Sequence, residues 1–248
     1  MKLKAAIGLL ILLLIFGGCS AWENAYEQAG SSSFSVISIK GPGALSFIKA
    51  MEPGIEPTVR LGDTVQYTFE EDEDVLYNRV LEGEFDIALV PTEMAAKLYN
   101  NEIGYQMVAV ITSGWMPDLN EGADHDRTAI IQDEWKQANV TEPLPQVSLI
   151  VKKEIAAQET EAWEMFLADY QDSINWINDN PDKAETLLQK HDVGIPANQT
   201  EQVLQQSSLQ YIDALSAGPI VERYLNIFLE LSPDSISGKL PDSDFYTE

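Results

Sequence analysis

The chain has 248 residues, of which 45% are hydrophobic and five are tryptophan. This content is too apolar for a disordered chain, and it allows a packed core in one large domain or two small ones. Forty acidic and 15 basic side chains give a formal net charge of −25. That balance argues against nucleic acid and anionic membrane headgroups as partners, because both would repel the chain.

The N-terminus has the pattern of an export signal. Lys2 and Lys4 precede an apolar run from Ala5 to Phe16, which is too short to span a bilayer comfortably. Gly17-Gly18-Cys19 then resembles the lipobox of bacterial lipoproteins, although Phe16 stands where that pattern usually has an aliphatic residue. We expect a lipoprotein signal peptide over 1–18 and acylation, for example with palmitate, of Cys19, the single cysteine. The alternative is an ordinary secretory signal with an incidental cysteine.

The segment 19–33 predicts a flexible tether, because it is mostly polar or small and ends in Gly30-Ser31-Ser32-Ser33. Anchored in this way, the protein would lie on the outer face of the cell membrane or on the periplasmic side of an envelope membrane. Its attachment would then depend on the lipid and not on charge.

The stretch 34–51 predicts a strand, a turn and a helix. Phe34–Ile39 carries apolar residues on both faces and is rich in Val and Ile, which is typical of a central strand. Gly41-Pro42-Gly43 breaks this strand, and from Ala44 to Met51 the apolar spacing becomes helical. Such a junction can offer free backbone N–H groups to a ligand.

Two short strands and a helix follow. Thr58-Val-Arg-Leu and Val65-Gln-Tyr-Thr-Phe predict strands, and the five acids Glu70–Asp74 predict a helix start that continues over Val75–Leu81. The alternative, a calcium loop, would need alternating oxygen ligands and a glycine in mid-loop, which this run lacks.

A second junction lies at Pro91. Gly83-Glu-Phe-Asp-Ile-Ala-Leu-Val90 predicts a strand, Thr92 an N-cap, and Glu93–Tyr99 a helix. Gln106–Thr112 predicts another buried strand that ends at Ser113-Gly114-Trp115. We expect the two junctions and this strand end to converge at the carboxyl ends of one sheet.

The rest of the chain begins with a polar loop over 115–127 and becomes helical. His125 in that loop lacks a clustered second His or Cys, so a surface loop is favoured over a metal site. Thr128–Ile131 and Val147–Val151 predict strands. Helical spacing then runs from Glu154, a helix ends at Asn180-Pro181, and Asp182 begins the next one. Pro219–Leu231 predicts a last amphipathic helix before an irregular tail.

Several segments together resemble one family, the nitrate/taurine-type substrate-binding lipoproteins of bacterial ABC importers. The similar segments are Ile39-Lys-Gly-Pro-Gly with its helix, Gly83-Glu-Phe-Asp-Ile-Ala-Leu-Val-Pro-Thr with Ala95-Ala96 and Leu98-Tyr99-Asn100, Trp176-Ile-Asn-Asp-Asn-Pro-Asp, and the tail Ser235-Ile-Ser-Gly-Lys-Leu-Pro-Asp-Ser-Asp-Phe-Tyr. Four such segments in the right order behind a lipobox are fairly specific.

The resemblance implies an α/β fold like that of type II periplasmic binding proteins, with a mixed, mostly parallel sheet, flanking helices and a helical C-terminal half. Family members have two lobes that clamp a ligand. Here Asp126–Trp135 and Leu144–Lys153 already resemble the return to the first lobe. We therefore expect 34–248 to form a single solute-binding-like lobe, with the loop 115–127 where a second lobe would normally be inserted.

The resemblance also implies a set of ligand-facing residues: Gly41, Pro42, Gly43, Ala44, Pro91, Thr92, Glu93, Ser113, Gly114 and Trp115. Helix N–H groups would favour an anionic or carbonyl-bearing ligand. Glu93 would favour a cationic or hydrogen-bond-donating ligand if it faces the site, and it has no such effect if it is an ordinary first-turn acid facing solvent. Trp115 would either stack on a planar ligand or cover the core, and the core is favoured.

The leading hypothesis is a lipid-anchored solute-binding protein of an ABC importer, or a reduced relative, with a small-molecule ligand and permease subunits as partners. The alternative is a one-lobed envelope interaction protein that has lost solute capture. An enzyme is not expected, since neither His125 nor His191 belongs to a catalytic motif and no nucleophile motif or phosphate loop occurs. We expect neither a cofactor nor a metal.

Overall fold

The computed structural model describes residues 34–52, 65–112, 130–131, 133–136, 143–158, 161–196, 198–206 and 209–247. Cys19, the tether, the loop 115–127 and the predicted strand at Thr58 therefore lie outside the described residues. Within the described ranges, no helix combines the length and the apolar character that crossing a membrane requires.

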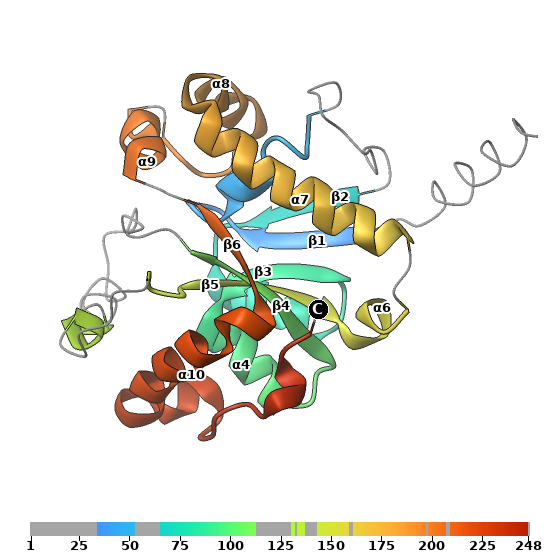
Figure 1. Cartoon of the computed structure of the whole chain (residues 1–248), viewed down its shortest axis with the longest axis vertical. Coiled ribbons are helices and arrows are strands. Elements are labelled where there is room, and N and C mark those ends of the chain that lie inside the picture. Colours follow the sequence, from blue (N-terminus) through green and yellow to red (C-terminus); the bar gives the residue numbers. More distant parts are fainter. Residues whose placement is uncertain are drawn as a thin grey trace, which may run out of the picture.

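The described residues build one sheet of six strands (Figure 1). The strands are β1 Phe34–Ile39, β2 Val65–Glu70, β3 Ile87–Pro91, β4 Tyr105–Thr112, β5 Val147–Lys152 and β6 Gln210–Asp213. Their spatial order is β2-β1-β3-β5-β4-β6. β1 pairs in parallel with β2 and β3, whereas β5 is antiparallel to both β3 and β4, and β6 is antiparallel to β4. The strands β1 to β4 therefore run in one direction, and β5 and β6 run in the other.

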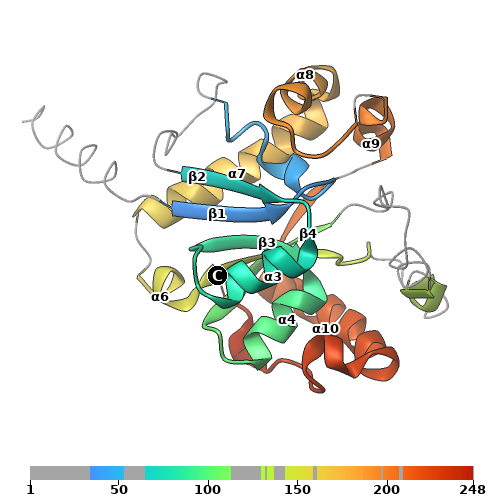
Figure 2. The ribbon, with the colours of Figure 1, turned by 180° about the vertical axis from the view of Figure 1, so that it is seen from behind.

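Helices cover both faces of this sheet (Figures 1 and 2). One layer contains α7 Glu161–Asp179, α8 Pro181–His191, α9 Thr200–Gln206 and the 3₁₀ helix η1 Ala44–Phe47. The other layer contains α3 Glu73–Leu81, α4 Thr92–Asn100 and α10 Ala214–Leu231. The short elements α6 Lys153–Ala156, η2 Pro233–Ile236 and η3 Ser243–Phe245 complete the described chain.

The alternation of side chains along β1 explains why both faces need a cover. Phe34 and Val36 join the core under η1, α7 and α8, while Ile37 joins the core with α3, α4 and α10. A strand buried on both faces is apolar on both faces, as the sequence of β1 is. This is the α/β single lobe, helical in its C-terminal half, that the sequence predicts.

Several predicted elements are confirmed. The strands at 34–39, 65–69, 106–112 and 147–151 all form, and so do the helices after Asp74, Glu154 and Pro181. Asp72 caps α3 by accepting hydrogen bonds from the N–H groups of Asp74 and Val75 at 2.8 and 3.1 Å. The acidic run therefore starts a helix, as its placement at the positive end of the helix dipole suggests.

Other predictions are wrong in detail. The helix expected over 44–51 is a 3₁₀ helix of four residues followed by turns. Ile130 and Ile131, expected in a strand, are helical. The last helix begins at Ala214, five positions before Pro219, which lies inside it. The four-residue strand β6 was not predicted, because Gln210–Asp213 carries no alternating pattern.

Candidate functional site

The carboxyl ends of β1, β3 and β4 lie along one edge of the sheet. β1 and β3 are parallel, with Ser38 opposite Leu89. Val147, the first residue of β5, pairs with Pro91 at the end of β3 and with Ile111 near the end of β4. These three strand ends therefore converge around the start of β5, where ligands of open α/β sheets usually bind. We call this the carboxyl edge.

The first junction, Gly41–Ala44 after β1, packs directly against β3 and β5 at the carboxyl edge. Gly43 is buried, and a Cβ added to it would lie 3.5 Å from a methyl group of Leu89 and 3.6 Å from one of Val147. Gly41 has φ +129°, a conformation that L side chains rarely adopt. Backbone conformation therefore favours glycine at position 41, whereas at position 43 an added Cβ would make ordinary van der Waals contacts.

Two N–H groups of this junction donate to carbonyl groups within the chain. The N–H of Gly41 donates to the carbonyl oxygen of Val193 at 2.7 Å, and the N–H of Ala44 donates to the carbonyl of Gly41 at 3.1 Å. Pro42 has no N–H and is half-buried. The N–H groups of Gly41 and Ala44 are therefore not free to bind a ligand, and Pro42 between them has none to offer.

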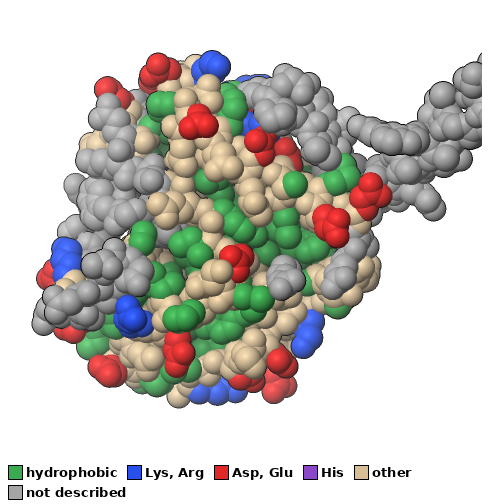
Figure 3. Space-filling model, in the orientation of Figure 1, with side chains coloured by type: hydrophobic (Ala, Val, Ile, Leu, Met, Phe, Trp, Pro, Cys, Tyr) green, Lys and Arg blue, Asp and Glu red, His purple; other side chains and the backbone are tan. Residues whose placement is uncertain are grey.

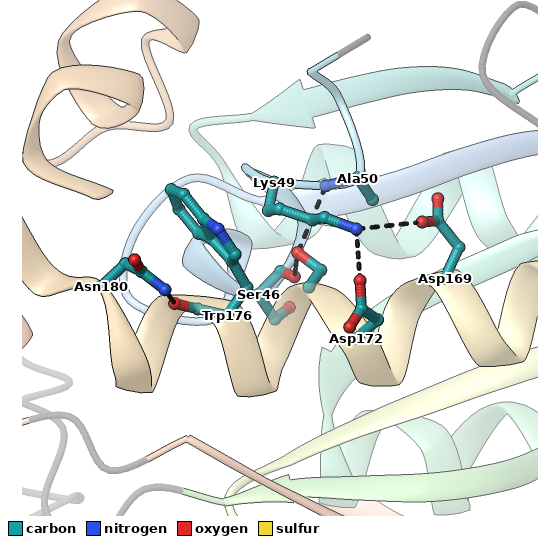
Figure 4. A network of polar contacts seen from close by, with 8 residues as sticks. Ser46, Lys49, Ala50, Asp169, Asp172, Trp176 and Asn180 are labelled. Atoms are coloured by element: carbon teal, nitrogen blue, oxygen red, sulfur yellow. Dashed lines mark hydrogen bonds and ion pairs between the residues drawn. The ribbon is translucent and has the colours of Figure 1, made fainter. Parts of the chain in front are cut away.

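Side chains of α7 hold η1 in place (Figure 4). The Ser46 hydroxyl donates to the carbonyl of Gly43 at 2.8 Å and lies 2.8 Å from the hydroxyl of Tyr170, while Ser173 donates to the carbonyl of Ser46 at 2.7 Å. Burial raises the pKa of Tyr170, so its phenol stays protonated and can donate to Ser46. This chain of hydrogen bonds connects the core of α7 to a predicted site residue.

A buried ion cluster lies beside these hydroxyl groups (Figure 4). Lys49 has no exposed side-chain surface, and its Nζ lies 2.5 Å from Asp172 and 3.5 Å from Asp169. The two aspartates are 33% and 12% exposed. The ammonium group of Lys49 is therefore buried, whereas the carboxylates of Asp169 and Asp172 that pair with it are partly exposed.

The C-terminal end of α8 fastens the junction from the other side. Lys40 Nζ lies 3.0 Å from both Glu71 and Asp192, and these hydrogen bonds raise the pKa of Lys40. Glu52, just beyond η1, accepts from Lys190 Nζ and contacts His191 Nε2, both at 2.5 Å. Sequence reasoning missed this contact, because Glu52 and Lys190 are 138 positions apart along the chain and no local pattern connects them.

At the second junction, Pro91–Glu93, the hydroxyl group of Thr92 is also buried. Thr92 is fully buried, its N–H donates to the carbonyl of Gln146 at 3.0 Å, and its hydroxyl lies 2.8 Å from that of Ser148. The prediction of Thr92 as an N-cap is wrong: Pro91 occupies that position and Thr92 is the first residue of α4. A buried hydroxyl pair stabilises the contact of α4 with β5.

Glu93 is in the first turn of α4, and its side chain contacts α10. Its side chain is half-buried, and the Tyr224 hydroxyl donates to its Oε2 at 3.4 Å. Tyr224 is buried and meets the ring of Trp135 edge-on, with ring centroids 6.3 Å apart. The carboxylate of Glu93 is therefore partly exposed at the carboxyl edge and is contacted by a residue of α10.

The structure thus brings seven of the predicted site residues to one edge: Gly41, Pro42, Gly43, Ala44, Pro91, Thr92 and Glu93. Ser113, Gly114 and Trp115 lie outside the described residues, as does His125. Within the described chain, no group of three or more His, Cys, Asp or Glu side chains is placed to hold a metal ion.

Comparison with known proteins gives a likeness of structure. No family model matches the sequence, and no curated protein matches it. A solved ABC transporter protein from Parabacteroides distasonis is similar with a TM-score of 0.68 and 16% identity, over 88% of this chain and 99% of that one.

Two other solved structures have names that state a ligand. The periplasmic aliphatic sulphonate binding protein of Escherichia coli has a TM-score of 0.55 and 11% identity, over 85% of this chain and 92% of that one. The periplasmic nitrate-binding protein of Synechocystis PCC 6803 has a TM-score of 0.58 and 10% identity, over 83% and 84%. At these identities the likeness establishes the fold alone, and the chain has the fold of periplasmic binding proteins.

Proposed function

We propose that the protein is a solute-binding component of an ABC importer, or a reduced relative of one, that binds a small molecule at the carboxyl edge outside the cytoplasm. The observation that carries the proposal is the convergence of two strand–turn–helix junctions on the start of β5. It occurs in a fold shared with import proteins whose names describe transport and binding. Such convergence is where α/β proteins of this topology bind ligands.

The predicted site residues divide into two groups by burial. Pro42, Pro91 and Glu93 are half-buried and would touch the ligand, whereas Gly43, Ala44 and Thr92 are buried and would shape the edge beneath it. Ser113, Gly114 and Trp115 would follow the end of β4. The role proposed here is capture of a ligand for permease subunits, without chemistry on it and without a cofactor.

The proposal includes an anchor at the N-terminus. After cleavage of the signal peptide 1–18, acylation of Cys19 would hold the protein at the membrane, and the segment 19–33 would tether it. Attachment would then depend on the lipid, because the excess of acidic side chains gives no attraction to anionic headgroups.

A thermal-shift screen of the purified full chain against a broad metabolite panel tests the proposal. A ligand at a hundred times its dissociation constant should raise the free energy of unfolding by about 2.7 kcal/mol, which is readily measured as a higher melting temperature. Glu93→Gln should change the stabilisation. Glu164→Gln is the control, since Glu164 is exposed on α7 and follows Trp163, whose ring contacts Phe34 at the start of β1. A folded protein that no member of the panel stabilises would rule out solute capture.

A second candidate function is docking to another envelope protein. It is favoured by the broad area of hydrophobic side chains over the middle of the face in Figure 3. It is also favoured by the engagement of Gly41 and Thr92 within the chain. Exposed apolar areas of this kind often mark protein contacts. A photoreactive residue in place of Leu215, which is 51% exposed and follows β6, should then crosslink to a partner in intact cells.

A further inference from the structure

The segment 238–247, which follows α10 and η2, returns to the sheet at β4 (Figure 1). Tyr246 forms a parallel bridge with Met107, and the N–H of Thr247 donates to the carbonyl of Met107 at 2.9 Å. On its other side Met107 pairs with Ile150 of β5. The segment therefore lies along the outer edge of β4, and we call it the edge strap.

The edge strap covers a part of β4 that β6 does not reach. In the described chain, β6 pairs with residues 109–112 of β4, and Asp213, opposite Ala109, is the N-cap of α10. Met107 lies two positions earlier on β4 and pairs with the strap instead. Without the strap, this first half of β4 would be an open strand edge, and open edges pair readily with strands of other molecules.

The side chain of Asn100, at the end of α4, holds the turn from which the strap begins. Its amide nitrogen donates to the carbonyl of Ile236 and to that of Lys239, both at 2.7 Å, and Asn100 is only 9% exposed. These two carbonyls flank Ser237 and Gly238, whose φ values are +55° and +72°. One buried side-chain amide therefore satisfies two backbone carbonyls of a turn with an uncommon backbone conformation.

Other side chains hold the strap along its length. The Tyr99 hydroxyl donates to the carboxylate of Asp242, and Gln106 Nε2 donates to the carbonyl of Asp244 at 2.6 Å. The Phe245 side chain is fully buried, and its ring packs on that of Tyr99 with centroids 5.1 Å apart. Side chains of α4 and β4 thus provide much of the attachment. Opening such a segment requires less free energy than unfolding the sheet beneath it.

The sequence of β4 makes an open edge hazardous. It reads YQMVAVIT, with no charge, no proline and no glycine. Such segments are prone to pair with identical segments of other chains. The strap instead places the exposed side chains of Asp242 and Asp244 beside this edge, and like charges oppose the approach of a second copy.

We propose that the edge strap closes β4 against strand addition by a second copy of this chain, and that Asn100 is the positioning residue that fastens it. The inference does not depend on the proposed solute-binding function. It predicts that loosening the strap converts a monomer into a chain that associates through β4.

The first experiment measures the opening of the strap in the purified full chain. All variants carry Cys19→Ala, so that neither a lipid nor a disulfide joins two copies. Asn100→Asp keeps the shape of the side chain and removes both N–H donors. Asn101→Asp is the matched control, because it adds the same charge one position along and its Oδ1 still accepts from the Ser237 hydroxyl, now at 3.0 Å.

Hydrogen exchange of peptides covering 239–247 should be about tenfold faster or more in Asn100→Asp, as expected for the loss of two hydrogen bonds. Exchange in β1 and β3 should stay unchanged, and so should exchange of the strap in Asn101→Asp.

The second experiment measures association by sedimentation velocity over a range of concentrations. High salt is used, since it screens the repulsion between chains of formal net charge −25. Asn100→Asp should dimerise as its concentration rises, whereas the Cys19→Ala chain and its Asn101→Asp variant should stay monomeric. Adding Gln106→Glu to Asn100→Asp places like charges on the edge and should restore the monomer. Gln66→Glu, exposed on β2 at the other end of the strand order, should not.

Thr247→Pro tests the same edge without a change in α4, and it decides the matter where Asn100→Asp fails to fold. It removes the N–H that donates to Met107, so it should also dimerise and respond in the same way to Gln106→Glu. A folded chain whose strap exchanges faster but stays monomeric at every concentration would overturn the protective role of the strap. Equal exchange in Asn100→Asp and Asn101→Asp would overturn the role of Asn100. Association that Gln106→Glu and Gln66→Glu reduce alike would overturn β4 as the contact.

Discussion

Lys49 and its two aspartates differ in their access to water. The lysine side chain has no exposed surface, whereas Asp172 is 33% exposed and Asp169 is 12% exposed. Loss of the lysine would leave carboxylates that water can still reach, but loss of both carboxylates would remove two counter-charges from a buried ammonium.

This asymmetry predicts an order of stability among variants. The double variant Asp169→Asn, Asp172→Asn should lose about 3–5 kcal/mol of unfolding free energy, and Lys49→Met should lose clearly less, because methionine keeps the apolar contacts of the stem. Urea unfolding at pH 7 measures both. The exposed pair Lys136–Asp133 is the control, and Lys136→Met should change stability by less than about 1 kcal/mol. The reverse order of the first two variants would contradict the prediction.

A side chain at position 194 should destabilise the fold by a steric clash in addition to backbone strain. Its φ of +81° disfavours any L side chain, and a Cβ there would lie 2.6 Å from the Lys40 Cβ. Gly194→Ala should therefore cost more than about 2 kcal/mol in denaturant unfolding. Gly104, with φ +84° and no heavy atom of the described chain within 4 Å of its added Cβ, isolates the strain. Gly104→Ala should cost about 1 kcal/mol, and equal losses at the two glycines would argue against the contact with Lys40.

Single residues were predictable where the cause is local. The turn at the first junction was predictable, because its glycines lie where the apolar spacing changes from that of a strand to that of a helix. The helix start at Glu70–Asp74 was predictable, because acids are favourable at the positive end of a helix dipole. The partners of these residues were not predictable. Thr92 is paired with Ser148, 56 positions along the chain, and Gly41 with Val193. No local pattern encodes which distant acceptor a donor will find.

Among the elements, α8 and the first junction are tied by a carboxylate whose charge depends on pH. Burial alone would raise the pKa of Glu52, but hydrogen bonds from Lys190 and His191 outweigh that effect and lower it below its ordinary value of 4.5. A carboxyl with a lowered pKa stabilises the folded chain above its unfolded pKa, and this stability is lost as the pH falls through the folded value.

The expected result is a pH-dependent effect of Glu52→Gln. At pH 7 the variant should lose about 1–2 kcal/mol relative to the unchanged chain, and the difference should shrink as the pH falls toward 3, through the lowered pKa of folded Glu52. Urea unfolding at the two pH values measures it. Glu164→Gln, at an exposed position on α7, gives the background for removing one carboxylate. A difference that stays constant with pH would show that the contact does not depend on the charge of Glu52.

Elements with strong periodicity were predictable, and those shaped by their neighbours were not. The apolar spacing of α7 places Trp163, Phe166 and Tyr170 in the core, as expected. The helix expected after Ala44 is limited to one 3₁₀ turn, where Ser46 is held by Tyr170 and Ser173 of that same α7. Tertiary hydrogen bonds thus override a helical pattern of eight residues that is too short to be stable alone.

At the scale of the whole molecule, the proposed anchor predicts where the chain is found. Cys19→Ala removes the only thiol of the sequence, so metabolic labelling with an alkyne-bearing fatty acid should be lost and the protein should move from the membrane fraction to the soluble fraction. Ser20→Ala is the control, because it changes the next side chain and keeps the thiol. A Cys19→Ala chain that stays with the membrane in high salt would indicate attachment by other means.

The α/β class of the molecule could be predicted from the alternation of strand and helix patterns, but the arrangement of its sheet could not. β5 is expected as a strand, yet nothing in Val147–Lys152 shows that it lies between β3 and β4 and runs antiparallel to both. That choice depends on which strand edges are open when the chain packs. The carboxyl edge was therefore predictable as a set of strand ends and not as a set of contacts.

The position of β5 also has a consequence for folding order. Among the described strands, β1, β2 and β3 pair with one another before β5 arrives. β4, with the sequence YQMVAVIT, has β5 and β6 as its strand partners, besides a single bridge from Met107 to Tyr246. A chain made from its N-terminus can complete a three-stranded half early, while β4 stays without a strand partner until residue 147 follows. Long-range pairing is slow, and an unpaired apolar strand promotes aggregation. Folding of this protein should therefore be slowest, and most in need of a chaperone, between the synthesis of β4 and that of β5.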